Sequence, residues 1–435
     1  MHNHKLSLGA AILLNINIMI GSGILIGPGQ IAAIACNASF LAWPIVALLF
    51  LPIVLCTVQL SRMFPGAGGF YSYAKEGLNS TAGFASGWLY VVGYTLCICV
   101  DVLALRQTLA VFAGHNIIID SPVLFNGICI MAYVLFNLLS FKIVSSFLNS
   151  LTIAKIVPLM ALVLLLPFII QPTFSITMHE IGFLPYSLPL AIFGFVGFEA
   201  CISVSHLIVD SKKNAPRAIL IGFLITAALY TLFHFGVLNV MGSQKLITLG
   251  APAFAEFLHV PIPYLKNLLM LLIPLTSIVT MIAAATGLMN ANAIMLHEMA
   301  QEKLFKGWSY VTKMSNHGRP WVAIVLEGVA IFCIATVIPN IAHVGGLCNL
   351  GIFLSFILPF VSLLLLQYKK RELRKIPLTM IALSMIVGLS GYSWYALGDS
   401  ILHRCLCSLP LFVAMGIGYL ILRRVDHESS GSTTR

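Results

Sequence analysis

The sequence predicts an all-α integral membrane protein with twelve transmembrane helices, and three observations carry that prediction. Of its 435 residues, 59% are hydrophobic and only 9% are charged, which excludes a soluble globular protein. Apolar runs near twenty residues, each long enough for a membrane helix, recur along the whole chain. Basic residues fall almost entirely on one side of the membrane when the N-terminus is placed in the cytoplasm, as the positive-inside rule requires.

The apolar runs set the expected order of elements. They cover roughly residues 8–35, 40–62, 84–112, 121–141, 149–171, 186–208, 216–241, 265–298, 320–338, 342–366, 376–397 and 401–422. The first run is too long for a signal peptide and leads directly into the second, so we expect it to be structural. The chain is predicted to form one transmembrane domain over residues 1–424. Residues 425–435 are expected to be a disordered cytoplasmic tail.

The distribution of charge indicates topology rather than nucleic-acid binding. Nineteen of the 24 Lys and Arg fall inside, four fall outside, and Lys155 lies within the fifth run. The inner residues are Lys5, Arg62, Lys75, Lys142, Lys212, Lys213, Arg217, Lys303, Lys306, Lys313, Arg319, Lys369, Lys370, Arg371, Arg374, Lys375, Arg423, Arg424 and Arg435. We therefore expect a multi-pass protein of the plasma membrane, in a bacterium the inner membrane, with both termini in the cytoplasm.

The middle of the first run, from Met19 to Pro28, reads Met-Ile-Gly-Ser-Gly-Ile-Leu-Ile-Gly-Pro, which is unusual for a membrane helix. Lipid offers the backbone no hydrogen-bonding partners, so irregular chain at this depth is tolerated only inside protein or beside a wet cavity. A break would free N–H groups for a carboxylate and carbonyls for an ammonium, which suits a small zwitterion. Close helix packing through Gly23-x-x-x-Gly27 explains the glycines equally well.

A second glycine-interrupted stretch lies in the sixth run, where residues 193–199 read Phe-Gly-Phe-Val-Gly-Phe-Glu. It opens the second set of five helices as the first run opens the first set. Interrupted segments at matching positions of two halves indicate an inverted-repeat transporter and mark its substrate site. The expected repeats cover about 8–171 and 186–366, and two additional helices follow at about 376–422.

Glu199 is predicted to lie deep in the membrane. It is about 13 residues from one end of its run and nine from the other, which places it more than about 10 Å from either surface. A carboxyl group at that depth needs a partner or a role. Because burial favours the protonated form, Glu199 is a candidate proton carrier. A permanently protonated, structural glutamate bonded to nearby backbone is the alternative.

Asp101 is similarly deep in the third run. Arg106 follows five positions later and about 140° round the helix, so it is a poor partner within the helix. The counter-charge must come from Lys155, from Arg106 through a neighbouring helix, or from a cationic substrate. An internal Asp–Lys pair explains Asp101 at least as well as a substrate does.

Two further charges lie within apolar runs. Lys155 is about five residues, or roughly 7–8 Å, from the cytoplasmic start of the fifth run, so its side chain can reach the surface and serve only as an anchor. Glu327 in the ninth run has no evident partner in the sequence, and we assign it no role.

Several motifs resemble the amino acid–polyamine–organocation (APC) superfamily of secondary transporters, over essentially the whole chain. The segment Met19–Ile24 with Pro28 resembles the family's first-helix signature, and Pro65–Tyr73 resembles the loop after the second helix. The segment Gly197–Glu199, followed by Lys213–Ile219, resembles the sixth helix and the loop behind it.

One further motif departs from the family. The segment Met299–Phe305 is similar to the stretch after the eighth helix, but it lacks the usual Ala-Arg-Asp-Gly.

The resemblance implies a five-plus-five inverted-repeat fold with broken first and sixth helices, two further helices, and alternating access to a site near mid-membrane. By position, the backbone of Ser22 and Gly23 would bind a substrate carboxylate. Carbonyls of Met19, Phe193 and Val196 would accept its amine. The implied substrate-binding residues are Met19, Gly21, Ser22, Gly23, Phe193, Val196 and Gly197, with Asp101 beside them.

The resemblance also bears on coupling and on substrate. Thr152–Lys155 resembles the fifth-helix motif of members whose lysine ammonium stands where sodium binds in other relatives, which argues against sodium dependence. Asp101 falls where a substrate side chain would lie, and a carboxylate there suits lysine, arginine or ornithine. Phe193 and Leu288 replace tryptophans of arginine exchangers, which counts against arginine.

The resulting prediction is a secondary active amino acid transporter, either a proton-coupled symporter or an exchanger, in a lipid bilayer, as a monomer or homodimer. Glu199 and Lys155 are its candidate coupling residues. The alternatives are an amino acid/polyamine antiporter and a non-transporting nutrient sensor. We expect no cofactor, no metal and no enzyme activity, because the sequence carries no His-x-x-His cluster, no Gly-x-Ser-x-Gly and no P-loop.

Overall fold

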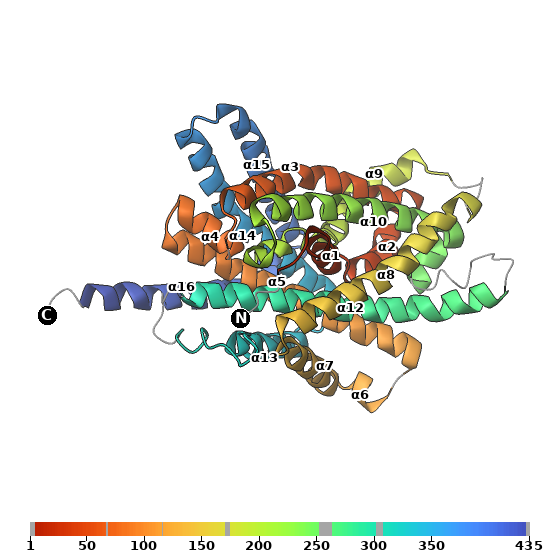
Figure 1. The fold of residues 1–435 in the computed structure, drawn as a ribbon. Helices are drawn as coiled ribbons and strands as arrows, with labels where there is room; N and C mark the ends of the chain where they lie inside the picture. Colours follow the sequence, from red (N-terminus) through yellow and green to blue (C-terminus); the bar gives the residue numbers. More distant parts are fainter. Residues whose placement is uncertain are drawn as a thin grey trace.

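The computed structural model is a bundle of helices that run mostly in one direction across Figure 1. It describes residues 5–66, 68–114, 116–169, 175–251, 263–301 and 308–431. Across these residues it contains no β-strand beyond an isolated bridge between Leu6 and Ile208. Some predicted features lie outside the described residues: Ala67, the end of the fifth run at 170–171, residues 302–305, Lys303, Lys306 and Arg435.

The first half of the chain forms helices over the predicted apolar runs and short helices between them. These are α1 (Leu8–Met19), α2 (Gly23–Ala35), the 3-10 helix η1 (Cys36–Leu41), α3 (Ala42–Met63), α4 (Gly69–Gly77), α5 (Ser80–Ala113), α6 (Ile117–Asp120), α7 (Pro122–Asn137) and α8 (Phe141–Ile169). Capping residues determine where several of these helices begin. The side chain of Asn79 caps α5, and Ser121 caps α7, whose first residue is a proline.

The second half follows the same pattern. It contains α9 (Met178–Phe193), η2 (Ala200–Ile202), η3 (Ser205–Leu207), α10 (Ser211–Leu249), α12 (Pro263–Gln301), α13 (Trp321–Val337), α14 (Ile341–Lys369), η5 (Leu373–Lys375), α15 (Ile376–Tyr395) and α16 (Ile401–Gly431). A capping box between Thr177 and Glu180 begins α9 eight residues before the expected start of the sixth run. The helix α16 continues to Gly431, beyond the boundary expected at Val425.

The helices have the composition of membrane spans. Seven helical stretches of described residues are long and apolar enough to cross a membrane, and α1, α7 and α13 are shorter apolar helices. The multi-pass membrane character of the chain follows from these helices. The count of twelve spans and the five-plus-five repeat stay predictions.

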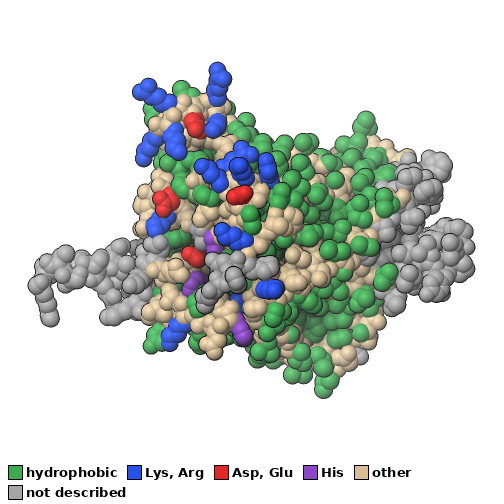
Figure 2. Space-filling view, viewed as in Figure 1, with side chains coloured by type: hydrophobic (Ala, Val, Ile, Leu, Met, Phe, Trp, Pro, Cys, Tyr) green, Lys and Arg blue, Asp and Glu red, His purple; other side chains and the backbone are tan. Residues whose placement is uncertain are grey.

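Positive charge gathers at one end of the bundle. Figure 2 shows Lys and Arg side chains around the connection between α14 and α15, while hydrophobic side chains cover much of the remaining face. The exposed residues of this connection include Lys369, Lys370, Arg371, Arg374 and Lys375. This separation of basic and apolar surface is typical of a membrane protein with one basic side.

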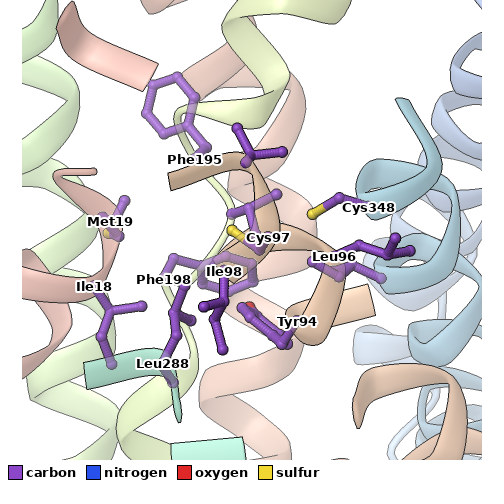
Figure 3. Packing of buried hydrophobic residues seen from close by; sticks show 14 of the residues in the cluster. Ile18, Met19, Tyr94, Leu96, Cys97, Ile98, Phe195, Phe198, Leu288 and Cys348 are labelled. Atoms are coloured by element: carbon purple, nitrogen blue, oxygen red, sulfur yellow. The ribbon is translucent and has the colours of Figure 1, made fainter. Parts of the chain in front are cut away.

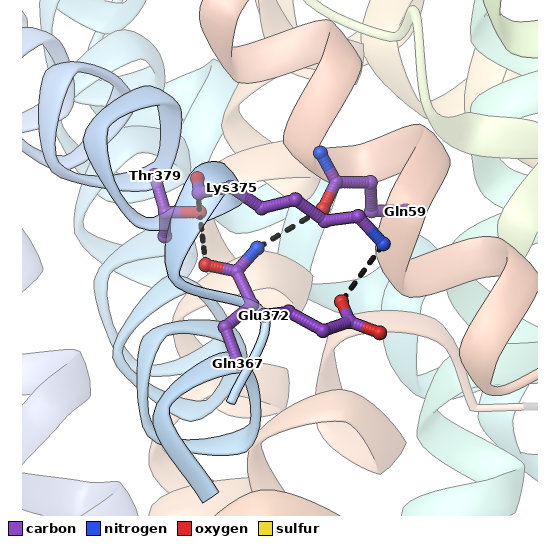
Figure 4. A network of polar contacts seen from close by, with 5 residues as sticks. All are labelled: Gln59, Gln367, Glu372, Lys375 and Thr379. Atoms are coloured by element: carbon purple, nitrogen blue, oxygen red, sulfur yellow. Dashed lines mark hydrogen bonds and ion pairs between the residues drawn. The ribbon is translucent and has the colours of Figure 1, made fainter. Parts of the chain in front are cut away.

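A buried polar network attaches α15 to the rest of the bundle at the same end. Figure 4 shows the amide of Gln367 on α14 between Gln59 on α3 and Thr379 on α15. Gln367 Nε2 donates to Gln59 Oε1 at 3.0 Å, and Thr379 Oγ1 donates to Gln367 Oε1 at 2.9 Å. Because unpaired amides are costly away from water, these bonds fix the position of α15 relative to α3 and α14.

The centre of the bundle is α5, which packs against α14, α12 and α4. The approach of α5 to α14 depends on glycine. A Cβ atom at Gly93 would lie 2.9 Å from the backbone nitrogen of Ile352 and 3.3 Å from the carbonyl carbon of Gly351. Small residues at a helix crossing let two backbones come into contact inside a membrane.

Replacing this glycine is therefore expected to destabilise the protein. Gly93→Ala places a methyl group against a backbone that cannot move aside, and overpacking of this kind costs about 1–3 kcal/mol. We expect a lower thermal unfolding midpoint in detergent. The control is Gly391→Ala on α15, where an added Cβ meets no atom within 4 Å and alanine favours the helix. Equal midpoints for the two variants would contradict the proposed role of this crossing.

Candidate functional site

The two glycine-interrupted segments meet in the middle of the bundle. A Cβ atom at Gly23, the first residue of α2, would lie 3.1 Å from the Cα of Gly194, just after α9. A Cβ at Gly197 would lie 2.6 Å from the side chain of Ile18 near the end of α1. The structure therefore brings together the two segments that the sequence singled out, and glycine is what permits the contact.

Both breaks are real interruptions of the helical backbone. Between α1 and α2, Ile20 leaves the helical conformation with φ −80° and ψ 82°. After α9, Gly197 has φ +101°, a conformation that favours glycine over any other residue. The second half of the sixth run then continues as the short 3-10 helices η2 and η3, so the run is interrupted as expected and its second half is not α-helical.

Lys155 on α8 supports the carbonyl end of the first break. Its side chain is fully buried, and Nζ donates to the carbonyl oxygens of Asn17 and Ile20, at 2.6 Å each. The hydroxyl of Tyr230 on α10 donates to the carbonyl of Met19 at 2.5 Å. The lysine thus lies on the break and does not extend to the surface, which corrects the interpretation of Lys155 as a simple anchor.

Asp101 on α5 supports the other end of the same break. Its Oδ1 accepts the backbone N–H of Ser22 at 3.0 Å, and the side chain is 2% exposed. A carboxylate at the start of α2 interacts favourably with the helix dipole. In the described part of the chain Asp101 forms no ion pair with Lys155 or Arg106, so its partner is a backbone group that the sequence did not suggest.

Glu199 is fully buried beside Tyr94. The hydroxyl of Tyr94 on α5 donates to Glu199 Oε1, while Oε2 has no partner among the described residues. In Figure 3, Tyr94 lies with Phe198 and Leu288 among the apolar side chains between the end of α1 and α5. Sequence reasoning missed Tyr94, because a tyrosine in an apolar run does not differ from an ordinary packing residue.

Asn15 on α1 joins the two breaks. Its Nδ2 donates to the carbonyl of Phe198 at 2.7 Å, and its Oδ1 accepts the N–H of Cys201 at 2.9 Å. The side chain is fully buried and satisfies two backbone groups that the irregular segment leaves free. A polar amide within the first apolar run was the available signal, since such groups are costly in lipid.

Glu327 on α13 has the partner that the sequence did not reveal. Asn292 on α12 donates from Nδ2 to Glu327 Oε1 at 2.6 Å, and the same amide group lies 3.0 Å from the carbonyl of Val91 on α5. The pair therefore links three helices. Glu327 lies outside the cavity described next.

A cavity of about 140 Å³ begins at the break between α1 and α2. Its walls come from α2, α5, α9, α14 and α15, and they include Ser22, Gly23 and Phe193. Exposed residues at the far end, among them Gln30 and Ala342, open it to the surface at the end of α2. Of the predicted site, three residues line the cavity. Met19, Gly21, Asp101, Lys155, Val196, Gly197 and Glu199 lie around it without lining it.

Two lining residues were missed by sequence reasoning. Asn349 lies on α14 and Ser393 on α15, and both are nearly fully buried. The side-chain oxygens of both residues have no hydrogen-bond partner in the described part of the protein. Neither residue had a signal in the sequence: Ser393 lies on a helix outside the two expected repeats, and Asn349 is a single uncharged polar residue in the tenth apolar run.

Comparisons with known proteins point in one direction. The family model described as amino acid permease matches residues 6–417. A probable agmatine/putrescine antiporter of Lactococcus lactis is 24% identical over 79% of this chain and 75% of its own length.

Two relatives of Bacillus subtilis extend the comparison. A serine/threonine exchanger is 22% identical over 93% of each chain, and an aspartate–proton symporter is 24% identical over 89% of this chain and 77% of its own. These relatives carry different substrates, but all are transporters. The resemblance to the APC superfamily is confirmed, and the chain belongs to the amino acid permease family.

Proposed function

We propose that this protein is a secondary active amino acid transporter that works by alternating access, with its substrate site at the two helix breaks. The observation that carries the proposal is the contact between Gly23 and Gly194, at the inner end of a cavity that opens to the surface. Discontinuous helices that meet at mid-membrane provide free backbone groups for a zwitterion.

Backbone groups supply the proposed recognition of the amino acid. The N–H groups of Gly23 and Ile24 open α2 before the first bonds to the Ser22 carbonyl, which Leu25 and Ile26 make, and they suit the substrate carboxylate. Ser22 would contribute when Asp101 releases its N–H. The carbonyls of Phe193 and Val196 would accept the ammonium. The carbonyl of Met19 already accepts from the Tyr230 hydroxyl and from the N–H of Gly21, so it would contribute when one of these donors is released. The glycines at 21 and 197 let the chain approach the substrate closely.

The described conformation fits one half of a transport cycle. The cavity opens where α2 ends, whereas the opposite ends of the breaks are joined by backbone bonds. Leu6 N donates to the carbonyl of Leu207 at 2.7 Å, and Val209 N donates to the carbonyl of Leu6 at 2.9 Å. With the basic end in the cytoplasm, the cavity faces outward. Opening to the inside would then require these two bonds to break.

Lys155 and Glu199 are the proposed coupling residues. The Lys155 ammonium already occupies a position between carbonyl oxygens, where a sodium ion would otherwise bind, so we propose sodium-independent transport. Glu199 has one free carboxyl oxygen and a tyrosine partner, which suits a group that gains and loses a proton during the cycle.

The primary test is uptake of a labelled amino acid panel by proteoliposomes, with and without an imposed inward proton gradient. Proton symport predicts uptake that requires the gradient and is unchanged by replacing sodium with choline. Uptake that needs only internal amino acid would make the protein an exchanger. Specific binding without any transport would support the sensor alternative instead.

Glu199→Gln is expected to abolish gradient-driven uptake and to spare counterflow exchange, because glutamine keeps the hydrogen-bonding shape but cannot carry a proton. The measurement is uptake and counterflow in the same proteoliposomes. Glu327→Gln is the matched control: it alters another buried carboxyl group, which pairs with Asn292, and gradient dependence should persist. Unchanged gradient dependence in Glu199→Gln would rule out this proton carrier.

Asp101 offers a test between its two interpretations. We propose that it positions the break through Ser22, because its carboxylate faces that N–H and not the cavity. Asp101→Asn keeps an acceptor and should retain uptake of lysine and leucine in their original ratio. Asp101→Ala removes the acceptor and should reduce both about equally. A loss confined to lysine and ornithine in Asp101→Asn would instead make Asp101 the selector of cationic substrates.

A further inference from the structure

We infer that the cavity beside the helix breaks selects small amino acids with an uncharged, hydrogen-bonding side chain, such as serine, threonine or asparagine. Asn349 and Ser393 are the residues that would recognise this side chain. The inference rests on the proposed function, since it names the substrate class of the same site. The relatives do not decide it, because their substrates include diamines, hydroxyl amino acids and aspartate.

The charge of the cavity disfavours a charged substrate side chain. Among the described residues that line it, none carries a charged side chain. Asp101 lies behind the break and is engaged by the N–H of Ser22. A lysine or aspartate side chain would therefore find no counter-charge in this lining, and its enclosure when the site closes would be strongly unfavourable. An uncharged side chain avoids that cost.

Buried oxygens without a partner on the cavity wall indicate a ligand that forms hydrogen bonds. Asn349 Oδ1 and Ser393 Oγ are buried and have no hydrogen-bond partner in the described part of the protein. Ser22 Oγ, at the helix break, is a third oxygen on the same cavity that is unpaired among the described residues. Buried polar atoms are normally paired, so unpaired ones that share a cavity indicate that a ligand group completes them. Ser390, one turn earlier on α15, bonds to the carbonyl of Ile386 at 2.8 Å. Ser393 differs from its neighbour in this respect.

The positions of Asn349 and Ser393 suit contact with a substrate side chain. They lie on α14 and α15, whereas the backbone groups proposed to hold the carboxylate and amine lie at the end of α1, on α2, and at and just after the end of α9. Asn349 and Ser393 can therefore face the side chain while the breaks hold the α-carbon groups. An amide that can donate and accept, next to a hydroxyl, suits a substrate hydroxyl or amide.

The size of the cavity favours a small substrate. A protein cavity of about 150 Å³ is known to accommodate one benzene molecule. The cavity here is about 140 Å³. This volume matches alanine, serine or threonine better than lysine, ornithine or arginine.

The test uses purified full-length protein and measures both binding and counterflow transport. Binding is measured as stabilisation against thermal unfolding by serine, alanine, leucine and lysine, and transport is measured in proteoliposomes. The wild-type protein should prefer serine to alanine and should bind lysine weakly. Asn349→Ala and Ser393→Ala should each weaken serine roughly five- to tenfold and leave alanine nearly unchanged, because alanine has no group for these residues to bind.

Three controls separate selection from folding. Ser390→Ala removes a buried serine of the same helix that does not line the cavity, and the preference for serine should persist. Ser393→Thr keeps the hydroxyl and should retain the preference for serine over alanine. Alanine counterflow by each variant reports that the site still forms.

The outcomes distinguish the two proposals. A wild-type preference for lysine or ornithine, or a serine-to-alanine ratio that neither variant changes, would overturn the substrate class while transport stands. Binding of serine that depends on Asn349 and Ser393, without uptake or counterflow, would uphold the recognition site and overturn transport. No stabilisation by serine over alanine in the wild-type protein would also overturn the inference.

Discussion

The constraint on which this structure depends is the need to satisfy backbone groups at two helix breaks inside a membrane. Lipid cannot hydrogen-bond a free carbonyl or N–H, so side chains must do so. Lys155 and Tyr230 engage carbonyls where α1 ends, and Asp101 engages the N–H of Ser22 where α2 begins. Asn15 bonds to the irregular segment after α9. These four side chains come from three other helices and from α1 itself, so the proposed site and the side chains that stabilise it form one structural unit.

The supports are arranged with opposite charge at the two ends of the first break. An ammonium lies on the carbonyl end and a carboxylate lies on the N–H end, which is the arrangement that the partial charges of helix termini favour. These contacts are hydrogen bonds to backbone and not ion pairs, so a ligand group that displaced Lys155 or Asp101 would have to offset the loss of a partner for a buried charge. Glycine contacts at 23, 194 and 197 allow the two broken segments to lie against each other. Alternating access requires two groups of helices to move against each other at such an interface.

The helices outside the expected repeats also take part. The network of Gln59, Gln367 and Thr379 attaches α15 to α3 and α14 at the basic end of the bundle. That attachment fixes the helix on which Ser393 reaches the cavity. The pair of Glu327 and Asn292 likewise links α13, α12 and α5, away from the cavity. These two networks therefore hold neighbouring helices together without facing the cavity.

Sequence alone determined the membrane class, the positions of the apolar helices and the two interrupted segments, because hydrophobic run length and glycine within a run are local properties. It also identified Asp101, Lys155 and Glu199, since a charge in an apolar run is visible without a structure. Only the tertiary structure decided their partners: backbone for Asp101 and Lys155, and Tyr94 for Glu199. It alone revealed Asn349 and Ser393 as cavity residues. Asparagine, serine and tyrosine are tolerated throughout such helices, so their role depends on which helix faces them.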